Sequence, residues 1–169
     1  MVLVYYGDNA ALKPAFDKAF KTLGIEKKDL GKEDLKTAMG ELIKAPKKEV
    51  TDFGTGPLFM YLDGHGARDL QRIGEVLAKE NIHVSHKAMK TENNQSWPLE
   101  VLMDEIDKED RWYKARSRLY QLLVTPDKDR LDKDPDYMRL MSAAYDLYDR
   151  QDASVEELEE AVKAIEKTM

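Results

Sequence analysis

Two short runs of apolar residues mark the most buried parts of the chain. They are Val2 to Tyr6 and Pro57 to Leu62, and each ends in a cluster of turn-forming residues. A continuous apolar run of this length followed by glycine and asparagine or aspartate predicts a buried strand. The second run has the pattern of a central parallel strand. Weaker patterns predict further strands over Ile25 to Leu30 and Ile82 to Met89.

Apolar residues at helical spacing separate these strands. They predict helices over Ala10 to Leu23, Lys32 to Ile43 and Ala67 to Asn81, and a long helix from Trp97 to about Leu123. Asp8 or Asn9 is the expected N-cap of the first helix. The alternation of strands and helices predicts an α/β fold, a small three-layer domain with a mostly parallel sheet of three or four strands. The sequence shows no internal repeat.

The C-terminal part has a different pattern. Thr125 to Asp136 is rich in charge and contains two prolines, which predicts a linker. Two helices follow, Asp136 to Arg150 and Val155 to Met169, and Ser154 with Glu157 forms a capping-box sequence. We therefore expect an α/β domain over residues 1–125 and a helical extension over residues 126–169. Neither helix can bury its apolar stripe alone, so each must pack on the other, on the long helix or on a second copy.

Composition restricts the possible functions. The chain has 169 residues, no cysteine and a net charge of −6, so disulfides, thiol catalysis and cysteine-ligated metals are excluded. Residues 126–169 hold 13 acids and 7 bases, which accounts for the whole net charge. This acidic balance argues against a nucleic-acid partner. No apolar run is long enough to span a membrane, and the N-terminus lacks signal-peptide features. We expect a cytoplasmic protein.

The most distinctive segment begins at Lys87-Ala88 and continues through Thr91, Asn94 and Trp97 into an acidic amphipathic helix. This spacing resembles a bacterial family of uncharacterised proteins, catalogued as domain of unknown function 3783. The resemblance covers roughly residues 1–125 and implies a cytoplasmic α/β domain with no established activity. Pro98 stands where the family has a hydroxylic capping residue, so we expect Ser96 to cap the helix instead.

Polar residues follow the predicted strands, where parallel sheets bind their ligands. The candidate ligand-binding residues are Asp8, Asp63, His65, Thr91, Asn93 and Asn94, with Trp97 beside them. These residue types are also the usual ones of turns and caps. A phospho-receiver site that holds Mg²⁺ is a more specific form of the hypothesis, but only one acid follows the first strand. His65 has no partner placed by spacing that would make it a general base.

Two other segments each permit a functional and a structural interpretation. Arg111 to Arg118 is basic and aromatic, which suits RNA, although the preceding acids can neutralise it on a solvated helix face. Asp127 to Asp134 loosely matches a calcium loop but lacks its glycine and its terminal glutamate. A dimer or partner surface on the C-terminal helices would use Met138, Met141, Tyr145 and Tyr148.

No catalytic residue, metal site or cofactor is expected, since no nucleophile, base and orienting group can be placed together. The sequence favours a non-enzymatic cytoplasmic binding or regulatory module. Its partner would be another protein, or a second copy held through the C-terminal helices. The alternative is a small-molecule or phosphoryl-responsive domain with its site where the strands end.

Overall fold

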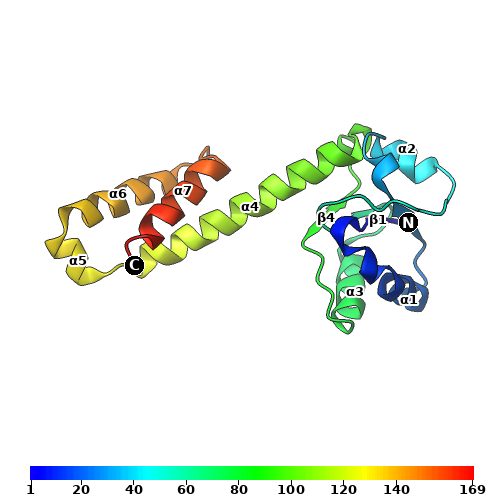
Figure 1. Cartoon of the computed structure of the whole chain (residues 1–169), viewed down its shortest axis with the longest axis horizontal. Helices are drawn as coiled ribbons and strands as arrows, with labels where there is room; N and C mark the ends of the chain where they lie inside the picture. The colour runs from blue at the N-terminus through cyan, green and yellow to red at the C-terminus, as the bar shows by residue number, and fades with distance from the viewer. The chain divides into compact units, whose positions relative to one another are not determined.

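The computed structural model describes all 169 residues, which form two compact units, residues 1–107 and 108–169. The division falls inside helix α4 (Figure 1). The first unit contains β1 (Val2–Tyr5), η1 (Gly7–Leu12), α1 (Lys13–Leu23), β2 (Lys27–Leu30), η2 (Lys32–Asp34), α2 (Met39–Lys44), β3 (Phe59–Leu62), α3 (Ala67–Ala78), β4 (His86–Met89), η3 (Asn94–Ser96) and the start of α4 (Leu99–Val124). The second contains the rest of α4 with α5 (Lys128–Lys133), α6 (Pro135–Asp149) and α7 (Val155–Glu166).

The four strands form one mixed sheet in the order β2-β1-β3-β4. β1 pairs with β2, and β3 with β4, in parallel. The two central strands are antiparallel, with Val2 opposite Leu62 and Tyr5 opposite Phe59. The α/β class, the mostly parallel pairing and the central place of β3 are therefore confirmed.

The sheet lies between two layers of helices. Val2, Val4 and Met60 face one core with α1 and α3, and Leu3 and Phe59 face the other with α2 and the first turns of α4. Figure 1 shows α1 and α3 on one side of the sheet and α2 on the other. All eight residues of β1 and β3 are buried, because each central strand has a neighbour on both sides and a helical layer on both faces.

The first unit consists of two halves with the same order of strands and α-helices. β1-η1-α1-β2-η2-α2 is followed by β3-α3-β4-η3-α4, so the two orders differ only by η1. Reciprocal hydrogen bonds join them: the backbone N–H of Met39 donates to the Trp97 carbonyl at 3.0 Å, and that of Leu99 donates to the Thr37 carbonyl at 3.1 Å. Between these bonds Ala38 pairs antiparallel with Pro98. The halves are thus related by an approximate two-fold axis, a repeat of structure that the amino-acid sequence does not show.

Each half uses one side chain to form the turn after its outer strand. In the first half the Asp34 carboxylate accepts from the Gly31 N–H at 2.8 Å. In the second, the Asn94 side-chain oxygen accepts from the Thr91 N–H at 2.9 Å. Both are turns in which a polar side chain replaces a backbone acceptor. The Thr-Asn-Trp spacing of the distinctive segment therefore encodes a turn that is also present in the other half.

Two predicted helices differ from the observed ones. The expected helix over Lys32 to Ile43 is divided into η2 and α2, because the Asp34 carboxylate accepts from the Gly31 N–H and an extended Ala38 follows. The helix expected from Ala10 begins as η1, and Asp8 does not cap α1. Instead the Asp8 carboxylate accepts from the Gly56 N–H at 3.1 Å.

The start of α4 is capped by the other half of the unit. The Leu99 N–H donates to the Thr37 carbonyl at 3.1 Å, and the Glu100 N–H donates to the Leu35 carbonyl at 2.9 Å. The first N–H groups of a helix lack partners within the helix, and backbone carbonyls supply them here. Ser96 is not the cap that the sequence suggested, since its hydroxyl donates to the Asn93 carbonyl at 2.9 Å.

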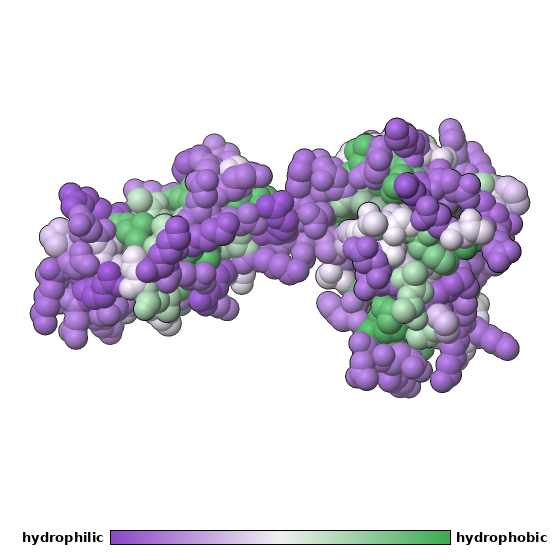
Figure 2. Space-filling model, viewed as in Figure 1, coloured by the Kyte–Doolittle hydropathy of each residue, from purple (hydrophilic) through white to green (hydrophobic).

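The second unit packs α4, α6 and α7 around its own core, which includes Leu119, Tyr137, Met141, Leu158 and Ile165. Hydrophilic residues cover most of the visible surface of each unit, with apolar residues showing between them (Figure 2). The Ser154–Glu157 capping box is confirmed. None of the helices in the chain has both the length and the apolar content that a membrane crossing requires.

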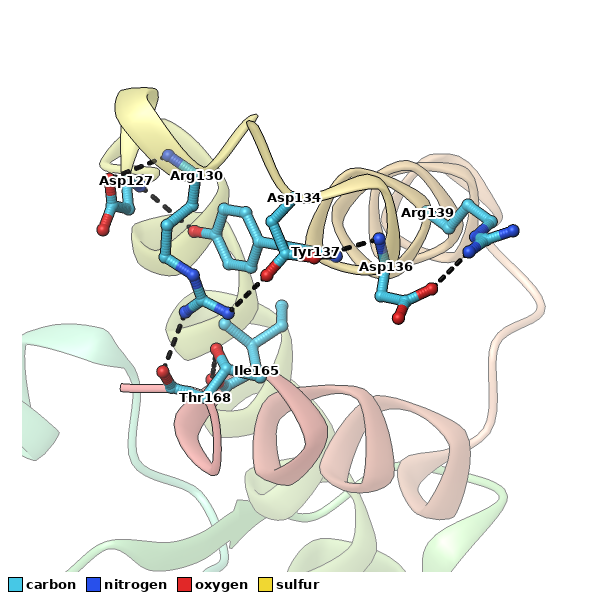
Figure 3. Close-up of polar contacts among 8 residues, drawn as sticks. All are labelled: Asp127, Arg130, Asp134, Asp136, Tyr137, Arg139, Ile165 and Thr168. Carbon is cyan, nitrogen blue, oxygen red and sulfur yellow. Dashed lines mark hydrogen bonds and ion pairs between the residues drawn. The ribbon is translucent and has the colours of Figure 1, made fainter. Parts of the chain in front are cut away.

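The expected linker after α4 contains the short helix α5. Asp127 caps it, and Asp134 caps α6 by accepting from the N–H groups of Asp136 and Tyr137 at 3.1 Å (Figure 3). Arg130 donates to the Thr168 carbonyl at 2.8 Å and stacks on the Tyr137 ring at 4.2 Å. The charged residues of this segment thus serve as caps and bridges, which a charge count alone does not show.

Substitution of Asn94 by alanine is expected to destabilise the first unit. Its side chain accepts from the Tyr61 hydroxyl at 2.7 Å and donates to the Met89 carbonyl at 2.9 Å, besides forming the turn. Loss of these partners should lower the free energy of unfolding by about 1–3 kcal/mol, measured by urea denaturation. Asn93→Ala is the matched control, because that exposed side chain has no such role, and its effect should stay within about 0.5 kcal/mol. Equal effects of the two substitutions would contradict this role for Asn94.

Candidate functional site

The strand-end residues predicted to form one site lie at two opposite edges of the sheet. Asp8 follows β1, whereas Asp63 follows β3 and Thr91 and Asn94 follow β4. Because β1 and β3 are antiparallel, the carboxyl end of β1 lies opposite that of β3. The expectation that all these residues meet at one edge is therefore wrong. A phospho-receiver arrangement of Asp8 with Asp63 has no geometric support.

Two of the predicted residues, Asp63 and His65, do gather at the β3–β4 edge together with their neighbours. An oxygen of the Asp63 carboxylate lies 3.4 Å from the Lys90 ammonium. Nδ1 of His65 lies 2.9 Å from the Asp69 carboxylate, one helical turn further along the chain. The Met1 amino group lies 3.0 Å from Nε2 of His65 and donates to the Asp63 carbonyl at 2.9 Å.

This pairing gives His65 the partner that sequence reasoning missed. The four-residue spacing from His65 to Asp69 could have indicated this pair, because such a spacing at the start of a helix places two side chains on one face. The hydrogen bond from His65 lowers the pKa of the Asp69 carboxyl. An aspartate in this position can orient an imidazole. The residues at this edge nevertheless pair with one another. No group of three or more His, Asp or Glu side chains lies close enough to hold a metal ion.

Of the remaining predicted residues, Asn94 and Thr91 serve the turn described above, and Asn93 is exposed. Trp97 is 37% exposed, and its backbone groups bond to Asn94 and Met39. The contacts of Thr91, Asn94 and Trp97 are thus structural. These residues do not lie together with Asp8 around one pocket.

A second candidate site lies in residues 108–169. Seven residues of α4, α6 and the following turn line a groove of about 560 Å³, and we call it the aromatic groove: Trp112, Tyr113, Arg116, Ser117, Tyr120, Tyr148 and Gln151. Trp112 is fixed by its indole N–H, which donates to the Ala153 carbonyl at 2.8 Å. The rings of Tyr120 and Tyr148 lie 5.7 Å apart across the two helices. Most of these residues belong to two separate segments that the sequence singled out, Arg111 to Arg118 and the C-terminal helices.

Arg116 lies among the rings of the aromatic groove. Its guanidinium is 4.2 Å from the ring centre of Tyr148 and 5.2 Å from that of Trp112, within the range of cation–π attraction. Its Nη1 is buried and has no hydrogen-bond partner in the protein. A buried N–H without an acceptor costs about 1–3 kcal/mol, so this group is the least satisfied one in the groove.

The other basic residues of the run Arg111 to Arg118 are paired with acids. Arg111 forms two hydrogen bonds with Glu159, at 3.1 and 2.9 Å. Lys114 lies 2.6 Å from Asp110, and Arg118 lies 2.7 Å from Glu166. These pairs leave little of the basic surface that an RNA partner would need.

Further large apolar side chains are exposed on α4 and α6. Tyr113, Tyr120 and Tyr145 are 60%, 51% and 62% exposed. Val124 and Met138 are also about half exposed. We call the aromatic groove together with Val124, Met138 and Tyr145 the α4–α6 face. Large side chains of this kind are usually buried, and a group of them exposed on the surface is typical of binding sites.

The His65–Asp69 pair is expected to control the titration of Asp69. Replacing His65 by glutamine removes the largest influence that lowers the Asp69 pKa, so this pKa should rise toward its ordinary value. Carboxyl ¹³C chemical shifts measured against pH would report the change. Arg72→Gln should raise the pKa less, because Arg72 acts only through its charge at 3.6 Å. An unchanged Asp69 pKa in the His65 variant would show that the pair does not form in solution.

Comparison with known proteins matches part of the chain to a family model. No curated protein and no solved structure matches the chain. The family model described as Domain of unknown function (DUF3783) matches residues 67–113. This match is shorter than the resemblance expected over residues 1–125, and it spans α3, β4, η3 and part of α4. Residues 67–113, with the Thr91-Asn94-Trp97 turn at their centre, thus resemble a domain to which no function is assigned.

Proposed function

We propose that the protein is a non-enzymatic binding module whose α4–α6 face binds another protein. The observation that carries this proposal is the exposure of Tyr113, Tyr120 and Tyr145 beside a groove that contains Trp112 and Arg116. Tryptophan, tyrosine and arginine are the residues that contribute most to protein–protein binding energy. They are also enriched, with methionine, in the centres of interfaces.

The rigidity of the face supports the same function. Trp112 is hydrogen-bonded to Ala153, and Tyr148 lies between Arg116 and Tyr120. Side chains that are already ordered lose little conformational entropy when a partner binds.

The second candidate function is a small-molecule site at the β3–β4 edge. The pairing of His65 with Asp69 and the Lys90–Asp63 contact favour it. It is the weaker candidate, because these groups satisfy one another and the grooves along α3 and β4 include neither Asp63 nor His65.

A photo-crosslinking experiment tests the proposed surface. A benzoylphenylalanine in place of Tyr120 should crosslink a defined protein in cells of the source organism, whereas the same residue in place of the exposed Glu156 on α7 should not. The crosslinked protein is then purified, and its affinity is measured by calorimetry. Tyr113→Ala and Tyr145→Ala should each weaken binding by about tenfold or more, as loss of a central aromatic residue does.

The matched control is Glu156→Ala, which should leave the affinity unchanged. Equal crosslinking from positions 120 and 156, or an affinity unaffected by both tyrosine substitutions, would refute the α4–α6 face as the binding surface. A crosslink to a second copy of the chain would refute the choice of another protein as partner.

A further inference from the structure

We propose that Arg116 binds a carboxylate, so that the segment seated in the aromatic groove is acidic and carries an aromatic or aliphatic side chain beside its acid. This inference rests on the proposed function and names the chemistry of the partner. It follows from the contacts of Arg116, from its contrast with a second stacked arginine, and from the charge around the groove.

Arg116 is the one basic residue between Arg111 and Arg118 that has no acid partner in the chain. Its three basic neighbours pair with Glu159, Asp110 and Glu166. Its guanidinium lies over the rings of Trp112 and Tyr148, and its Nη1 is buried without an acceptor. A guanidinium presents its N–H groups in a planar fork that matches two carboxylate oxygens. A carboxylate that enters the groove would therefore meet a guanidinium that has no acid partner in the chain.

Arg130 is a second arginine that stacks on a tyrosine ring, and its contacts can be compared with those of Arg116. Its guanidinium also lies 4.2 Å from a tyrosine ring, that of Tyr137. Unlike Arg116, it donates to the Thr168 carbonyl at 2.8 Å and to the Asp134 carboxylate at 3.2 Å (Figure 3). Arg130 therefore has hydrogen-bond acceptors within the protein, whereas Arg116, with the same kind of stacking, lines the aromatic groove.

The surroundings of Arg116 determine what else the partner carries. Tyr113, Tyr120 and Tyr148 are among the residues that line the groove, and aromatic rings favour contact with an apolar or aromatic side chain. Arg116 is the one basic residue among those that line the groove, so a highly charged polyanion would find a single positive charge there. A single carboxylate next to an apolar group fits both conditions.

Two probes that differ only in the acid group test this inference directly. They are 4-phenylbutyrate and 4-phenylbutanamide, titrated into the full-length ¹⁵N-labelled protein. The chain has two tryptophans, so the indole N–H signals report on the groove through Trp112 and on the first unit through Trp97. We expect phenylbutyrate to shift the Trp112 signal and leave Trp97 unchanged. The amide should require an about fivefold higher concentration, because it cannot form the charge-assisted pair.

Arg116→Gln should reduce phenylbutyrate binding to the level of the amide. Arg118→Gln removes the same charge two residues away and should leave the preference for the acid intact, since Arg118 bonds to Glu166 at 2.7 Å. Thermal unfolding of both variants verifies that they fold. Equal affinity for acid and amide, no shift of Trp112, or equal effects of the two substitutions would each overturn the inference.

The outcome separates this inference from the proposed function. Crosslinking at position 120 together with equal affinity for the two probes would leave the protein-binding face in place and reject the carboxylate. A preference for phenylbutyrate that depends on Arg116, without a specific crosslink at position 120, would establish the carboxylate site and reject a protein partner on this face.

Discussion

The antiparallel pairing of β1 with β3 is the constraint on which the first unit depends. It buries both central strands on two faces, and it relates β1-α1-β2 to β3-α3-β4 by an approximate two-fold axis. Helices α1 and α3 then share one layer, and α2 and α4 share the other. The same pairing directs the ends of the two central strands to opposite edges. The unit therefore lacks the single ligand-binding edge of a fully parallel sheet.

The second unit is stabilised in a different way. Its core is formed by helix–helix packing around Leu119 and Leu158, and its surface charges are largely used in caps and ion pairs. Asp127, Asp134 and Ser154 cap helices, and Arg111 and Arg118 tie α4 to α7. The exposed tyrosines of the α4–α6 face and the Arg116 Nη1, which has no acceptor, depart from this pattern. Departures from good local packing and pairing are expected at functional surfaces.

Much of the fold could be predicted from the sequence, because apolar periodicity depends on burial alone. The runs Val2 to Tyr6 and Pro57 to Leu62 indicated the two central strands, and Ser154 with Glu157 marked the start of α7. Periodicity contains no information about strand direction, so the antiparallel centre was not predicted. The repeat escaped detection because Asp34 and Asn94 form the same turn with different side chains. The aromatic groove joins residues far apart in sequence, and only packing brings Trp112 beside Tyr148.

The two-fold relation of the halves has a consequence for how this unit can change in evolution. Its halves meet as the subunits of a symmetric dimer do, each contributing the same surface to the other, but residues 45–58 join them in one chain. Because the halves are joined, a change in one is not imposed on the other. One has a six-residue α2 and the other has a 26-residue α4 in the equivalent place. A single chain can thus lengthen one half alone, which a symmetric dimer of identical chains cannot do.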